Sequence, residues 1–134
     1  MNYLLDTDTC IFWLKSHPAV KAKLLEVGWG QVAICAITVA ELYYGAYNSS
    51  RAIENLTHVE QFVQQLPVVP LHDSALRRFG QIKTGLRQQG QSLPDFDLLI
   101  ASVAISEDWI LVTNNLRHYQ RIADLHMETW IPPV

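Results

Sequence analysis

Three acidic residues, far apart along the chain, are the side chains best suited to chemistry. Asp6 follows the first apolar run, Glu41 lies shortly after the second, and Asp97 stands at the start of a long apolar segment. None of them has a Lys or Arg within a few positions. Carboxylate oxygens without His or Cys partners favour Mg²⁺ or Mn²⁺ over zinc. Because such an ion activates water and stabilises charge on a phosphodiester, these acids predict metal-dependent phosphodiester hydrolysis.

The electrostatic cost of gathering these acids favours a bound cation. Two carboxylates about 4 Å apart repel by about 4 kcal/mol at an effective dielectric near 20. Three of them without a cation would remove a large fraction of the stability of a small domain. The alternative is that each residue serves its own helix. In that case Asp6, Asp95 and Asn115 are helix caps, Thr38 and Glu41 form a capping box, and Asp97 interacts with a helix dipole.

The elements that must position these residues follow from the hydrophobic pattern. Short apolar runs alternate with longer segments of helical period, which indicates a central, mostly parallel β-sheet flanked by helices. Strands are expected at 3–5, 32–35, 68–71, 109–112 and 127–130, the third at an edge because it contains Pro70. Helices are expected at 7–15, 18–25, 38–47, 50–65, 74–88, 95–107 and 116–122. The segment 95–107 is apolar nearly all round and should be a central, buried helix.

Polar clusters follow the strands of this predicted sheet. In an open parallel sheet, ligands bind outside the carboxyl ends of the strands, where the following helices begin. Four clusters fall at such positions or at the start of the buried helix: Asp6-Thr7-Asp8, Thr38 with Glu41, Asp95 with Asp97, and Thr113-Asn114-Asn115. We therefore expect these groups to converge on one acidic cleft.

The composition of the 134 residues is that of a globular protein, with 49% hydrophobic residues, 17% charged residues and a net charge of −3. This negative charge gives no general affinity for nucleic acid. The longest nearly apolar stretch, 98–105, is too short to span a bilayer, and the first residues lack the basic region of a signal peptide. Cys10 and Cys35 stand alone in apolar segments, so we expect buried, reduced thiols in a cytoplasmic protein.

Four motifs in these clusters carry a family resemblance. They are LLDTDT at 4–9, TVAELYYG at 38–45, DFDLLIA at 95–101 and LVTNN at 111–115. In this order and spacing they resemble the PIN-domain nucleases, and most closely the VapC-type toxins of VapBC toxin–antitoxin pairs. The resemblance runs from residue 3 to about residue 130. It implies a three-layer α/β/α PIN-like fold, with residues 1–134 forming a single PIN-like nuclease domain.

The resemblance also implies an activity and partners. The activity is that of an endoribonuclease that cleaves RNA with Mg²⁺ or Mn²⁺ as the toxin of a type II toxin–antitoxin system. The expected partners are a second copy of the chain and a cognate VapB-type antitoxin whose C-terminal tail crosses the active-site groove. DNA is then contacted only indirectly, through the antitoxin complex. Independently of the family, Tyr43 and Tyr44 are expected to form a dimer contact.

Residue roles follow from the resemblance by position. Asp6 and Asp97 would be the principal metal ligands and Glu41 a third acidic ligand. Asn115, with Thr113 beside it, would hold a second ion or a water. Asp95 and Thr7 are weaker candidates for supporting positions near these catalytic residues.

One pair departs from the family pattern. Where the family often has an acid before an aromatic residue, this chain has His118 and Tyr119. A second ion that depends on that acid loses a ligand, so we expect a single tightly held ion.

A basic segment is the candidate for RNA contact. Arg77, Arg78, Lys83 and Arg87 lie in a stretch that contains no acid. Lys83 and Arg87 are four residues apart and so share a helix face, and with Arg78 they are candidates to bind RNA phosphates. A plain solvated helix face is the alternative. The five histidines show no metal-binding spacing, and surface or capping roles are expected for them.

Two other functions compete with the nuclease. A haloacid-dehalogenase-like phosphatase also uses an acid after its first strand, but it would need a catalytic Lys in the later half of the chain. The only Lys there is Lys83, which is predicted to lie in the middle of a helix. A non-catalytic PIN-like interaction domain, whose acids merely cap helices, is the second alternative.

Overall fold

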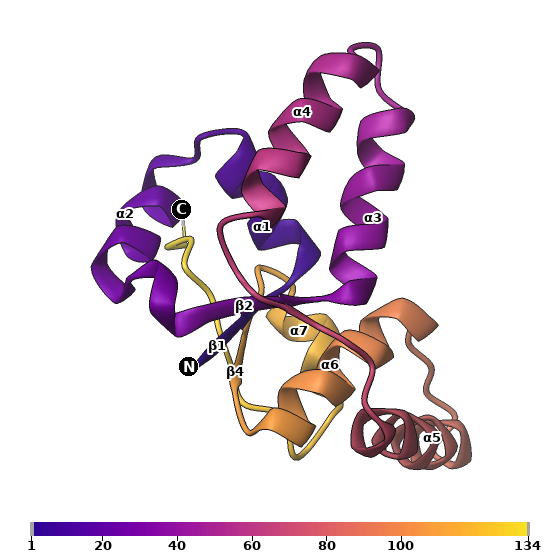
Figure 1. Cartoon of the computed structure of the whole chain (residues 1–134). Coiled ribbons are helices and arrows are strands. Elements are labelled where there is room, and N and C mark those ends of the chain that lie inside the picture. The colour runs from indigo at the N-terminus through magenta and orange to yellow at the C-terminus, as the bar shows by residue number, and fades with distance from the viewer. Residues whose placement is uncertain (1, 134) are drawn as a thin grey trace.

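Five parallel strands form the centre of the molecule in the computed structural model, which describes residues 2–133 (Figure 1). In chain order they are β1 (Tyr3–Leu5), β2 (Val32–Cys35), β3 (Val68–Val69), β4 (Ile110–Val112) and β5 (Met127–Glu128). Their order across the sheet is β3-β2-β1-β4-β5, and every neighbouring pair is parallel. After β1 the chain adds β2 and β3 on one side of that strand, and it later adds β4 and β5 on the other side.

The strands are apolar throughout because both faces of the sheet are covered. In register, Leu4 lies opposite Ala33 on β2 and Leu111 on β4, and these side chains belong to one half of the core. Their neighbours Leu5 and Val112 pack into the other half. A parallel sheet that buries both faces needs such continuous apolar runs rather than an alternating pattern.

Helices cover the two faces as separate layers. On one face lie α1 (Thr7–Leu14), α2 (Pro18–Val27), α3 (Ala36–Tyr47) and α4 (Ala52–Val63). On the other lie α5 (Asp73–Gln88), α6 (Asp95–Glu107) and the short α7 (Leu116–Tyr119). Figure 1 shows α3 and α4 side by side on one side of the sheet and the pair α5 and α6 on the other. The predicted three-layer α/β/α architecture is confirmed.

Helix α6 is the central, buried helix that its composition predicts. Six of its residues are buried, among them Ile100, Ala101 and Ala104, which are fully inaccessible. The helix ends at Asp108, whose backbone is left-handed with φ 58°. None of the helices within residues 2–133 is long and apolar enough to cross a membrane.

The element boundaries differ from prediction by at most three residues, and β1, β2 and α6 agree with it throughout. Helix α3 begins at Ala36, two residues before the predicted start, because Cys35 already occupies its N-cap position. Helix α2 continues to Val27 and stops at Gly28, whose φ of 89° only glycine adopts readily. Strand β3 pairs at the sheet edge, as expected, but for only two residues. Cys10 and Cys35 are buried free thiols, also as expected.

Candidate active site

Asp6 lies at the centre of the polar cluster because it follows β1, the middle strand. Its Oδ1 accepts a hydrogen bond from the Thr7 amide at 2.8 Å, and its Oδ2 accepts one from the Thr113 hydroxyl at 2.8 Å. Thr113 follows β4, the neighbouring strand, and is fully buried. Asp6 itself is only 6% exposed. The capping role and the place in the acidic cluster therefore belong to different oxygens of the same carboxylate.

Asp8 is the acid nearest to Asp6 in the sequence, and its negative charge disfavours ionisation of Asp6. The Asn114 amide donates to Asp8 Oδ2 at 3.0 Å, which ties the start of α1 to the segment after β4. Burial raises the pKa of Asp8. Burial, followed by the charge of Asp8 and more weakly that of Asp97, raises the pKa of Asp6 to about 7, against hydrogen bonds that lower it.

Glu41 reaches the cluster through Thr7. The Thr7 hydroxyl donates to Glu41 Oε1 at 2.6 Å and lies 3.2 Å from the Thr38 hydroxyl. Thr38 lies inside α3 rather than at its N-cap, and Cys35 holds that position without a side-chain hydrogen bond. The prediction that Thr38 and Glu41 form a capping box is therefore wrong. Glu41 is free to face another element because the helix starts earlier.

Asp97 lies in the first turn of α6, and its partner is a histidine. His118 Nε2 is 2.9 Å from Asp97 Oδ2, and both side chains are about a quarter exposed, at 25% and 27%. The expected surface or capping role is confirmed for His17, which caps α2, but is wrong for His118. His118 is also the residue at which the chain departs from the family pattern. Its bond to Asp97 crosses from α7 to α6, which sequence spacing does not reveal.

Asp95 and Asn115 stand at the margin of the cluster. Asp95 is the first residue of α6, and Pro94 takes the N-cap position, so the N-cap predicted for Asp95 is wrong. Its carboxylate instead accepts from Lys83 Nζ at 2.9 Å. Asn115 occupies the N-cap of α7 without a side-chain capping bond, and its backbone amide donates to the Thr113 hydroxyl at 3.0 Å. The Asn115 side chain is exposed.

The basic residues of α5 are mostly paired with acids. Arg77 contacts Asp73 at 2.7 Å and Arg78 contacts Asp124 at 3.6 Å, all of them at least partly exposed. Lys83 pairs with Asp95. Arg87 has no ion-pair partner within the described part of the chain. Exposed pairs of this kind contribute little to stability, so these residues remain available to other anions.

The donor set of the cluster fits a hard divalent cation. Its groups are oxygens of Asp6, Asp8, Glu41 and Asp97, and no Lys or Arg pairs with any of them in residues 2–133. The buried, electrostatically strained carboxylate of Asp6 is the group that a cation would relieve most. No three His, Cys, Asp or Glu side chains of the described chain are close enough together to enclose an ion. Glu41 is instead hydrogen-bonded to Thr7, and Asp97 to His118.

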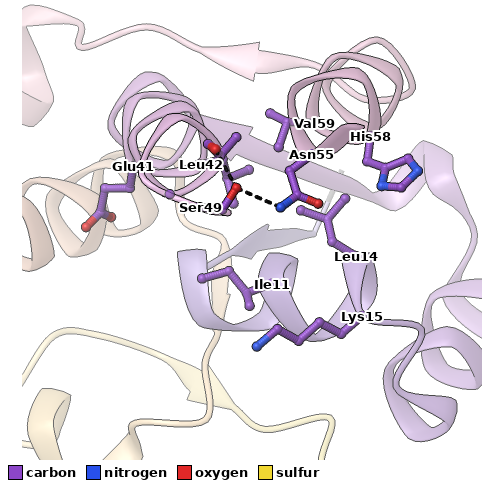
Figure 2. A pocket seen from close by; sticks show the side chains of 11 residues that line it. Ile11, Leu14, Lys15, Glu41, Leu42, Ser49, Asn55, His58 and Val59 are labelled. Atoms are coloured by element: carbon purple, nitrogen blue, oxygen red, sulfur yellow. Dashed lines mark hydrogen bonds between the residues drawn. The ribbon is translucent and has the colours of Figure 1, made fainter. Parts of the chain in front are cut away.

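A largely apolar groove of about 390 Å³ adjoins the cluster. Figure 2 shows Ile11 and Leu14 of α1 facing Leu42 of α3 and Val59 of α4, with Glu41 to one side of these apolar residues. The Asn55 amide donates to Ser49 Oγ at 2.9 Å across the turn between α3 and α4. The groove thus offers an apolar floor that begins beside an acidic residue of the cluster.

Known proteins share both the sequence and the fold. The PIN domain family matches residues 3–125. The tRNA(fMet)-specific endonuclease VapC of Shigella flexneri is 36% identical over 97% of this chain and 98% of its own length. Ribonuclease VapC2 of Haemophilus influenzae is 36% identical over 98% of this chain and 99% of its own. The crystal structure of DNA-bound VapBC from Salmonella typhimurium superimposes with a TM-score of 0.93 at 34% identity, covering 98% of this chain and 99% of that one. The phosphatase and scaffold alternatives are not favoured by these relatives, and the chain belongs to the PIN-domain family of VapC ribonucleases.

Proposed function

We propose that this chain is a Mg²⁺- or Mn²⁺-dependent endoribonuclease that acts in the cytoplasm, as a single nuclease domain, as the toxin of a toxin–antitoxin pair. The observation that carries the proposal is the buried Asp6 carboxylate at the end of the central strand, in a chain similar to VapC ribonucleases. The charge of Asp97 raises the pKa of Asp6, and Glu41 is hydrogen-bonded to the adjacent Thr7. Asp6 and Asp97 are the principal ion ligands and Glu41 is the third acid. When bound, the ion supplies an activated water and charge stabilisation at the scissile phosphate.

The chain's own residues prepare this site in distinct ways. Thr113 and the Thr7 amide fix the Asp6 carboxylate by one hydrogen bond to each oxygen. The Thr7 hydroxyl directs Glu41 toward the same strand ends. Asn115 would hold a water at the margin of the site, and Asp95 would support the site from the same margin.

RNA cleavage by matched variants tests the proposal. The Shigella relative is named for tRNA(fMet), so this tRNA is the first substrate to use. We expect cleavage with Mn²⁺, none with chelator, and a loss of at least about a hundredfold in Asp6→Asn and Asp97→Asn, because the charge that binds the ion is removed. Asp108→Asn is the control, since Asp108 is exposed at the far end of α6 and Asn tolerates its left-handed backbone. Cleavage by Asp6→Asn at the parental rate would refute the assignment.

The antitoxin is expected to occupy the apolar groove beside Glu41. VapBC structures are among the solved structures most like this chain, and the groove lies next to the acids that an inhibitor must cover. Co-expression with the product of the adjacent reading frame should yield a stable complex. Ile11→Glu should weaken it because it places a charge on the groove floor, whereas Ile53→Glu, at a position 85% exposed and outside the groove, should not. Equal recovery of both complexes would exclude the groove as the docking site.

A further inference from the structure

The short helix α7 contributes two aromatic side chains, His118 and Tyr119, beside the acidic cluster. It follows the Thr113-Asn114-Asn115 segment and ends at Tyr119. His118 and Tyr119 pack against each other edge to face, with ring centroids 5.4 Å apart. His118 Nε2 contacts Asp97 Oδ2 at 2.9 Å, which is the one side-chain hydrogen bond of either residue in the described chain.

The Tyr119 hydroxyl is the unsatisfied polar group of this region. Tyr119 is 1% exposed, and its hydroxyl has no hydrogen-bond partner among residues 2–133. Burial and then the charges of Asp6 and Asp97 raise the pKa of Tyr119. A buried hydroxyl without a partner costs about 1–3 kcal/mol. Because the Tyr119 ring packs against His118, which contacts Asp97, this unpaired hydroxyl indicates a donor that is used when the site is occupied.

The His118 contact limits what Asp97 can do. An imidazole N–H that donates to Oδ2 fixes the plane of the carboxylate and leaves Oδ1 as the oxygen available to a ligand. Outer partners of this kind orient ligands to metals, and their loss weakens metal affinity roughly 10- to 100-fold. Neither His118 nor Tyr119 adds negative charge, so these residues can orient the acids but do not increase the number of cations that the cluster can bind.

We propose that His118 and Tyr119 are positioning residues of the ion site: His118 orients Asp97, Tyr119 supplies its buried hydroxyl as a hydrogen-bond donor in the ion-bound site, and the site holds one ion. This inference rests on the proposed metal-dependent function. It adds the two residues of α7 that shape the site and its stoichiometry.

Calorimetric titration of the metal-free protein with Mn²⁺ alone tests the inference without any activity readout. The parental chain should bind one ion. His118→Ala should weaken binding roughly tenfold or more, and His118→Gln, which keeps an N–H donor, should recover most of the loss. Tyr119→Phe removes only the hydroxyl and should weaken binding about three- to tenfold. His126→Ala and Tyr47→Phe, at exposed positions outside the cluster, are the matched controls and should bind as the parent does.

A double-mutant cycle separates positioning from a general effect on the fold. In the Asp97→Asn background, His118→Ala should cause no further loss of Mn²⁺ affinity, because its partner is already removed. Parental affinity in His118→Ala, tighter binding in that variant, or two ions per chain would overturn the inference while leaving the nuclease proposal intact. Failure of the parental chain to bind Mn²⁺ at all would overturn both.

Discussion

Asp6 illustrates how one residue satisfies two interpretations that compete in the sequence. From the sequence, Asp6 is either a helix cap or a member of an acidic cluster. In the structure its Oδ1 caps α1 through the Thr7 amide, and its Oδ2 accepts a hydrogen bond from Thr113 after the neighbouring strand. Ionisation of this carboxyl group is unfavourable in the folded chain, because burial and neighbouring acids raise its pKa to about 7. A residue placed only to cap a helix would be exposed and would not carry this cost.

The raised pKa of Asp6 predicts a pH-dependent stability in the absence of metal. Its carboxyl group binds a proton more tightly in the folded chain, with a pKa of about 7, than in the unfolded chain, near 3.8. The stability that the protonated group contributes is therefore complete below about pH 3.8 and is lost as the pH rises to about 7. At roughly 1.4 kcal/mol per pH unit, the loss from this residue is at most about 4 kcal/mol.

Urea unfolding with chelator at several pH values from 5 to 8 measures this effect. We expect the free energy of unfolding to fall over this range in the parental chain and to fall less in Asp6→Asn, which cannot ionise. Asp6→Asn should also be the more stable of the two at pH 8. Parallel curves for the two proteins would show that Asp6 is not the group responsible.

At the scale of the elements, the register of α5 against α6 decides what the basic segment does. The two helices pack together, which brings Lys83 to within 2.9 Å of Asp95, two residues before Asp97. Arg87, one turn later, remains without an ion-pair partner in the described chain. Arg77 is paired within its own helix, to Asp73.

This arrangement predicts a graded effect on RNA binding. Lys83→Ala combined with Arg87→Ala should weaken the affinity for RNA and reduce the slope of log K against log salt by about 1 for each phosphate that the variant no longer binds. Arg77→Ala should change neither, because Arg77 is six residues from Lys83 and so lies on another face of α5. Binding is measured with the Asp6→Asn variant, so that the RNA remains intact. An unchanged affinity and salt slope in the double variant would assign these residues to a solvated helix face.

At the scale of the whole molecule, the sheet order explains why one acidic cleft exists. The chain places β2 on one side of β1 and β4 on the other, so the segments after three adjacent strands meet at their carboxyl ends. Ligand sites of open α/β sheets form at this kind of switch in strand order. Of the helices that follow these strands, α1 and α3 lie in one layer and α7 in the other, so their first turns meet this edge of the sheet from both faces.

The assembly of two chains is expected to use the outer face of α3. Of the two tyrosines expected at this contact, Tyr43 is partly buried against the core, whereas Tyr44 is 70% exposed. Tyr47, one turn later, is equally exposed, which is unusual for aromatic side chains on an otherwise apolar helix. Tyr44→Glu should shift the chain from dimer to monomer in light scattering after size exclusion. Leu25→Glu, at a position 69% exposed on α2, is the control and should leave the mass unchanged. A parental chain that is already monomeric would contradict the expected homodimer.

Much of the fold was predictable because its determinants are local. Apolar runs such as 32–35 and the helical period of 95–107 place the elements, and the alternation of strands and helices implies a parallel sheet. The sheet topology also predicted that Asp6, after β1, and Glu41, in the helix after β2, lie toward the same edge of the sheet, whereas Asp97 stands at the start of α6 and depends on how that helix packs. The motifs that contain them also indicated the family.

Contacts between helices could not be obtained in the same way. The bond of His118 to Asp97 and the pairing of Lys83 with Asp95 depend on how α7 and α5 dock against α6. The start of α3 at Ala36, which releases Glu41 from a capping box, depends on how β2 ends. Hydrophobic periodicity specifies which face of a helix is buried. The polar partner of each side chain depends on how closely the packed elements approach one another. The sequence alone thus determined the sheet and the acids at its edge, and only the tertiary structure decided which neighbour holds each acid.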